Sequence, residues 1–253
     1  MLLLAGGVAA GVFGSLLGLG GGLLIVPLLT IGFGLPIRDA VGVSLVCVIV
    51  TSSASAGVFL ERRQANLRLG MILELFTAFG AVVGGVVAFL LDERILAGLF
   101  AILILYVAVS MGRGIRPRAT SRPPEDGSYE VKHLGPATIG AVGAGVTSAL
   151  LGIGGGRVKV PLMHLLMGVP LRVATATSNL MIGITASASA VVYLLRGGID
   201  ANAAGPTAIG VFLGARLGSR LGHRVDVRVL RVLFVAVLLY TAFEMARRAI
   251  GAS

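Results

Sequence analysis

The chain has 253 residues, of which 56% are hydrophobic and only 13% charged, and its mean hydropathy is +0.98. Soluble domains carry about 25% charged residues, so this composition excludes an ordinary soluble domain and indicates an integral membrane protein. The formal net charge of +10 does not point to nucleic acid, because the arginines gather at the ends of apolar runs, where topology and lipid head groups account for them.

The chain begins with an apolar segment that glycines interrupt and that lacks the basic region of a cleaved signal peptide. Three longer apolar segments follow, each near the roughly 20 residues that cross about 30 Å of hydrocarbon as a helix. They contain the single cysteine, Cys47, which we interpret as a packing residue. A polar, proline-rich stretch then predicts an exposed linker, and the same order of segments returns after it. The predicted spans are about 38–60, 70–91, 95–112, 172–195, 203–221 and 228–246.

The two halves form an internal repeat. Gly11–Gly22 returns as Gly145–Gly156, an offset of 134 residues, and the match continues as far as Arg62 and Arg196. Farther along, Thr-Ala-Phe-Gly at 77–80 resembles Thr-Ala-Ile-Gly at 207–210, an offset of 130. We therefore divide the chain into a first transmembrane repeat at 1–112, a cytoplasmic basic linker at 113–133 and a second transmembrane repeat at 134–253.

Arginines in the loops predict how the spans are oriented, because cytoplasmic loops carry an excess of Lys and Arg. The loop 61–68 has three arginines and is placed in the cytoplasm, whereas its repeat equivalent, 196–202, has one Arg and one Asp and is placed outside. The loop 92–94 is placed outside, and its equivalent, 216–228, with four arginines, inside. Equivalent loops on opposite sides predict an all-α integral membrane protein of two inverted-topology repeats, each a Gly-interrupted helical hairpin plus three transmembrane helices. The alternative is a parallel repeat, in which the glycine segment crosses once and the Arg-rich loop lies outside.

Three consecutive glycines in each half should break a helix inside an apolar segment, since each interior Gly costs roughly 1 kcal/mol relative to Ala. Broken backbone at membrane depth is tolerated only where it is buried in protein or lines a cavity. Pro27 and Pro161 are typical of a first helical turn, so we expect 20–26 and 154–160 to be unwound or barely helical, with short helices starting near each proline. The glycines are Gly20, Gly21 and Gly22 and their equivalents Gly154, Gly155 and Gly156.

Two helix N-termini would then face the middle of the protein. Their amide groups and positive dipole ends favour an anion, and the glycines let it approach the backbone closely. Paired interruptions at corresponding positions of two halves point to the binding site of a transporter. The alternative is that the glycines only allow helices to pack closely.

Two cations follow the second glycine run at positions where the first half is apolar: Arg157 stands in place of Leu23, and Lys159 in place of Ile25. A lipid-exposed cation in mid-membrane costs about 2.5 kcal/mol or more. Direct pairing with an anionic substrate explains both residues. The alternative is a shallow hairpin whose cations snorkel to the interface.

Small hydroxyl side chains are frequent in the first long span of each half. Most can bond to carbonyl groups of their own helix, but Ser44, Ser178 and Asn179 lie near the level of the glycine segments and are candidate substrate contacts. Glu74 could carry a coupling proton, but we interpret it as a residue near the membrane interface. We interpret His164 as a packing or hydrogen-bonding residue.

The pattern Gly-x-Gly-Gly-Gly-x-x-x-Val-Pro-Leu occurs at 18–28 and again at 152–162, and Ala-Thr-Ala-Thr-Ser-Asn-Leu follows at 174–180. These motifs resemble the sulfite exporter TauE/SafE family, and the likeness covers nearly the whole chain. The resemblance implies a secondary transporter of the bacterial inner membrane, with export as the expected direction. Its implied substrates are small anions such as sulfite, organosulfonates or related sulfur-containing or carboxylate anions. Arg157 and Lys159 fall at variable positions of the motif, so they would tune the substrate rather than mark the family.

We therefore expect alternating access around a central site. The expected partners are a small anionic substrate, membrane lipid and a second copy in a homodimer, but not nucleic acid. No catalytic residue, metal or cofactor is expected, because the sequence lacks Gly-x-Ser-Gly, clustered His and carboxylates, and a P-loop. The alternatives are an anion channel and a transporter for another small metabolite; a cation or amino-acid transporter would want more carboxylates in mid-membrane.

Overall fold

The computed structural model describes residues 1–16, 22–61, 65–112, 131, 133–221 and 227–251. Within these ranges the chain is helical and contains no strand, as the sequence predicts. The elements are α1 (Leu2–Leu16), α2 (Gly22–Pro27), the π-helical η1 (Leu28–Gly32), α3 (Ile37–Glu61), α4 (Leu67–Leu90), α5 (Glu93–Gly112), α6 (Leu134–Leu151), α7 (Gly156–Pro161), the π-helical η2 (Leu162–Leu166), α8 (Leu171–Leu195), α9 (Ala201–Leu221) and α10 (Val227–Ile250).

The six long helices α3–α5 and α8–α10 coincide with the six predicted spans to within a few residues. Among the described residues, four helical segments are long and apolar enough to cross a membrane: Leu67–Leu90, Glu93–Ser110, Leu134–Leu151 and Val173–Leu195. The third of these is α6, the first arm of the second predicted hairpin. This arm alone is as long as the apolar segment Glu93–Ser110 of α5.

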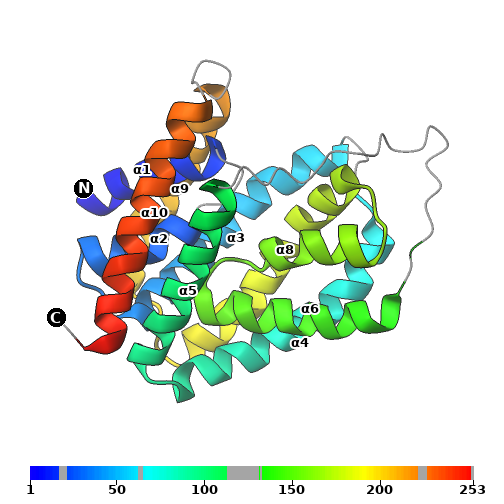
Figure 1. The fold of residues 1–253 in the computed structure, drawn as a ribbon, viewed down its shortest axis with the longest axis horizontal. Coiled ribbons are helices and arrows are strands. Elements are labelled where there is room, and N and C mark those ends of the chain that lie inside the picture. Colours follow the sequence, from blue (N-terminus) through cyan, green and yellow to red (C-terminus); the bar gives the residue numbers. More distant parts are fainter. Residues whose placement is uncertain (17–21, 62–64, 113–130, 132, 222–226, 252–253) are drawn as a thin grey trace.

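The element order of the first half repeats in the second, but the two halves do not pack as separate bodies. α1 packs along α9 of the other half, and its equivalent, α6, packs along α4 of the first half. The equivalent pairs α3 and α8, and α5 and α10, meet each other across the middle. Figure 1 shows α6 lying along α4 and α10 beside α5. Each half thus holds the first helix of the other, so the chain folds as one unit.

Glycines make these exchanged contacts close. A β-carbon at Gly80 of α4 would overlap the carbonyl group of Val142 of α6, and one at Gly214 of α9 would overlap the carbonyl group of Val8 of α1. Small residues at such positions let helix backbones approach one another in a membrane. Both residue pairs are related by the offset of 134.

The structural correspondence between α4 and α9 therefore keeps the offset of 134, and the offset of 130 taken from the Thr-Ala-Phe-Gly resemblance is wrong. A shift of four residues is about one helical turn. It leaves small residues on the same helix face, which explains why the sequence match at 130 looks convincing.

Replacing Gly145 of α6 by Ala should destabilise the protein, because a β-carbon there would overlap the carbonyl oxygen of Thr77 and lie 2.7 Å from the amide nitrogen of Ala81. Overpacking of this kind costs about 1–3 kcal/mol. Gly143→Ala on the same helix is the matched control, since no atom lies within 4 Å of its β-carbon position. Thermal unfolding of the purified variants in detergent, followed by size-exclusion chromatography, measures the difference. Equal melting temperatures for the two variants would contradict the exchanged packing of α4 and α6.

Candidate functional site

The second glycine run breaks the helix as the sequence predicts. α6 ends at Leu151 and α7 begins at Gly156. Between them Gly152, Gly154 and Gly155 have φ angles of +64°, +74° and +70°, a backbone region in which a β-carbon is strained. In the first half α1 ends at Leu16 and α2 begins at Gly22; Gly20 and Gly21 lie outside the described residues.

The expectation that short helices start near each proline is wrong, and 22–26 and 156–160 are helical rather than unwound. Both segments are short α-helices that begin at Gly22 and Gly156, and each proline is the last residue of its helix rather than the first. Proline has no N–H to donate to the residue four positions earlier. The chain therefore continues after Pro27 and Pro161 as a wider π-helical turn, in which Met167 N donates to Leu162 O at 3.3 Å.

The glycine segments of the two halves meet on α3. The Ser44 hydroxyl lies 3.2 Å from the carbonyl oxygen of Gly22 and 2.8 Å from that of Gly152, so it can donate to either. A β-carbon at Gly22 would lie 2.6 Å from the same Gly152 oxygen. Ser44, which is fully buried, thus joins the start of α2 to the end of α6.

Two buried hydroxyl groups beside the second break have no hydrogen-bond partner among the described residues: Ser148 Oγ on α6 and Ser178 Oγ on α8. A β-carbon at Gly156 would lie 3.3 Å from Ser178 Oγ, and one at Gly155 would lie 3.3 Å from the Ser148 β-carbon. Buried polar atoms are almost always hydrogen-bonded, so two such donors beside one backbone break call for a ligand or solvent. Ser178 was predicted from the sequence. Ser148 was missed, although it stands where the first half has Gly14.

Lys159 is buried and points at Glu74 of α4. Its ammonium group lies 3.0 Å from Glu74 Oε2 and 2.5 Å from the Thr185 hydroxyl of α8, and that hydroxyl donates to Glu74 Oε1 at 2.6 Å. The side chains of Lys159 and Glu74 are 1% and 7% exposed. The interpretation of Glu74 as an interfacial residue and the snorkelling alternative for Lys159 are therefore wrong.

The other predicted residues have simpler surroundings. The carbonyl oxygen of Asn179 accepts a hydrogen bond from Ser52 of α3 at 2.7 Å, and the Asn179 residue is half-buried. The His164 ring lies 2.9 Å from Val169 O, which confirms a hydrogen-bonding role. The side chain of Arg157 lies outside the described part of the chain.

Most hydroxyls of the long spans behave as expected for membrane helices and donate to carbonyl groups of their own helix. Residues of this kind are Thr51, Ser53, Thr175, Ser187 and Ser189. Within the described ranges, no group of three or more His, Cys, Asp or Glu side chains is placed to hold a metal ion.

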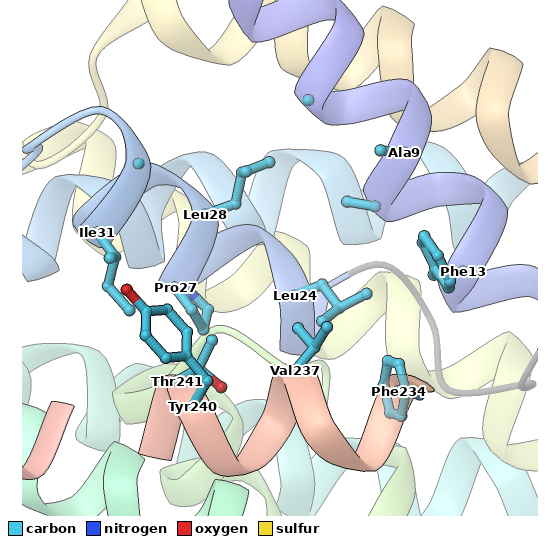
Figure 2. A pocket seen from close by; sticks show the side chains of 13 residues that line it. Ala9, Phe13, Leu24, Pro27, Leu28, Ile31, Phe234, Val237, Tyr240 and Thr241 are labelled. Atoms are coloured by element: carbon cyan, nitrogen blue, oxygen red, sulfur yellow. The ribbon is translucent and has the colours of Figure 1, made fainter. Parts of the chain in front are cut away.

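A cavity of about 310 Å³ lies elsewhere, between α1, the α2–η1 segment and α10. Figure 2 shows its apolar walls, with Phe13 of α1, Leu24 and Leu28 of the α2–η1 segment and Val237 of α10 around the same space. Its described lining includes none of the predicted site residues. The predicted site residues therefore lie away from this cavity.

The family described as sulfite exporter TauE/SafE matches residues 3–245. The chain belongs to this family.

Curated relatives of this TauE/SafE chain are named membrane transporters. "Probable membrane transporter protein YunE" of Bacillus subtilis is 27% identical over 218 residues, which cover 79% of this chain and 80% of that protein. A protein of Methanocaldococcus jannaschii with the same general name is 32% identical over 204 residues, 76% of this chain and 72% of the relative. No solved structure significantly matches the chain. The protein is thus a multi-pass membrane protein of a transporter family, not of an enzyme family.

Ser44→Ala should destabilise the protein by about 1–3 kcal/mol, because the variant leaves two buried carbonyl groups without their shared donor. Ser53→Ala is the control on the same helix, since the Ser53 hydroxyl is exposed and donates to Ile49 O of its own helix. The melting temperatures of the two purified variants provide the comparison. If Ser44→Ala melts with Ser53→Ala, the two glycine segments do not depend on this contact.

Proposed function

We propose that the protein is a secondary transporter of small anions that works by alternating access around the glycine breaks. The observation that carries the proposal is the pair of buried hydroxyls, Ser148 and Ser178, that lack a partner beside the Gly152–Gly156 break. Both are hydrogen-bond donors, and the cationic Lys159 follows within one helical turn of Gly156. An anion with several acceptor oxygens uses donors of this kind.

Carbonyl oxygens at the same place would repel an anion. The Ser44 hydroxyl reduces this repulsion by donating a hydrogen bond to a carbonyl oxygen there. This hydroxyl lies 3.2 Å from the carbonyl oxygen of Gly22 and 2.8 Å from that of Gly152 and can donate its one proton to either. The hydroxyls of Ser148 and Ser178 beside the second break have no partner among the described residues and stay available. We propose that Gly20, Gly21, Gly154, Gly155 and Gly156 supply the backbone approach for the same anion, with Arg157 and Asn179 at its edge.

Sulfite, organosulfonates and related small carboxylates are the proposed substrates, because they carry two or three acceptor oxygens on a small body. The name of the family, sulfite exporter, supports a sulfur oxyanion and export. The relatives in Bacillus subtilis and Methanocaldococcus jannaschii support the cell membrane of a prokaryote, and we propose the bacterial inner membrane.

Alternating access needs two arrangements of similar energy, and an inverted repeat supplies them because each half can take the place of the other. The exchanged packing of α1 with α9 and of α6 with α4 supports such a pseudo-two-fold relation. The two arginine-rich loops, 61–68 and 216–228, stand at non-equivalent positions of the two halves, and placing both in the cytoplasm supports the inverted orientation.

Transport by purified protein in proteoliposomes tests the function. Uptake of radiolabelled sulfite or a sulfonate should saturate with concentration, and unlabelled anion inside the vesicles should accelerate it by counterflow. Liposomes without protein are the control. Uptake that neither saturates nor shows counterflow would indicate a channel, and no uptake of any small anion would contradict the proposal.

Ser178→Ala should weaken binding of the transported anion by about ten- to hundredfold, because one donor hydrogen bond to a charged group contributes roughly 1.5–3 kcal/mol. The melting temperature should not fall, since the Ser178 hydroxyl has no protein partner to lose among the described residues. Ser187→Ala on the same helix is the control, because its hydroxyl bonds to Gly183 O. Isothermal titration or an anion-dependent thermal shift measures both. Unchanged affinity in Ser178→Ala would remove this residue from the site.

A further inference from the structure

The pair of Lys159 and Glu74 occurs in only one half of a repeated fold. At the offset of 134 the first half has Ile25 where the second has Lys159, and Ala208 stands opposite Glu74. Ile25 and Ala208 both belong to the hydrophobic core. Only the hydroxyl is common to the two halves, as Thr51 and Thr185. The first half therefore packs the equivalent positions with apolar residues instead of an ion pair.

This asymmetry argues that the ion pair does not serve stability. Replacing a buried ion pair by well-packed apolar residues is often neutral or stabilising, whereas removing one partner leaves an uncompensated charge. Ionisable residues inside a membrane protein are functional candidates for the same reason. The polar group lies close to the break: Thr185 and Ser178 are seven residues apart on α8, on one helix face and about 10 Å apart along its axis.

We propose that Glu74 is the internal counter-ion that the transported anion displaces from Lys159, and that the displaced carboxylate takes up a proton, so that anion and proton bind together. This inference rests on the proposed function. The long, flexible Lys159 side chain can pair with Glu74 or with an anion in the break, but its single charge cannot neutralise both. Glu74 is then left with the Thr185 hydroxyl alone, and a buried carboxylate without a cation is costly unless it is neutralised.

Among the side chains that the structure describes, only Lys159 forms an ion pair with Glu74. Of the helices packed on α4, α6 carries no titratable residue, and α8 carries Arg172 and Tyr193. These two lie about 20 Å and about 12 Å along the axis from Thr185. On α4 itself, Arg68 is six residues, or about 9 Å, away. The compensating charge therefore comes from water as one proton per anion, which leaves the net charge of the site unchanged.

Two variants and a control test this exchange. Glu74→Gln keeps the shape of the side chain but removes the competing charge. The double variant Lys159→Ile with Glu74→Ala reproduces the composition of the first half, so it should fold with a melting temperature at or above that of the unmodified protein. Glu244→Gln is the control, because Glu244 pairs with Arg247 at 3.5 Å on the surface.

Sulfite and ethanesulfonate are titrated into each purified protein in weak buffer, with affinity and proton uptake recorded together. The unmodified protein and Glu244→Gln should take up about one proton per bound anion more than Glu74→Gln does. Glu74→Gln should bind the anion about tenfold more tightly or more, and the double variant should not bind it. Equal proton uptake by Glu74→Gln and the unmodified protein, or anion binding by a folded double variant, overturns the inference while leaving the proposed function standing. No binding of either anion to the unmodified protein or to Glu74→Gln overturns both.

Discussion

The constraint on which the structure depends is that a helix broken inside a membrane must find partners for its backbone within the protein. Here the partner comes from the other half of the chain. α1 and α6, the helices that lead into the two breaks, pack on α9 and α4, and Ser44 joins the start of α2 to the end of α6. The exchange brings the start of α2 and the second break together beside Ser44 of α3.

A symmetric fold carries asymmetric chemistry. The helix order, the positions of the breaks and the close glycine contacts repeat at one offset. The polar groups do not: Ser148 stands opposite Gly14, and Lys159 opposite Ile25. Because the scaffold is duplicated, one half can keep the packing while the other acquires donors and charge. Polar groups therefore gather at the second break. The first half contributes Ser44, which contacts Gly152, and Glu74, which pairs with Lys159.

Much of the fold could be read from the sequence, because its signals are local. Apolar length predicts the spans, and the triple glycine at Gly154–Gly156 predicts the break. The site was harder, since its contacts join distant parts of the chain. Lys159 and Glu74 are 85 residues apart and share no pattern that would pair them. The position of the prolines at the ends of α2 and α7 was missed because proline is typical of a first turn, whereas here its missing N–H falls where each helix widens into a π-helical turn.

The proposed function requires that the transported anion binds beside the Gly152–Gly156 break. Selenite is the heavier analogue of sulfite, and its selenium gives an anomalous signal in a crystal of the purified protein. The account predicts an anomalous peak beside the Gly152–Gly156 break, within hydrogen-bond distance of Ser148 Oγ and Ser178 Oγ. A peak confined to the apolar cavity between α1 and α10 or to the protein surface, or a glycine segment seen as one unbroken helix, would contradict it.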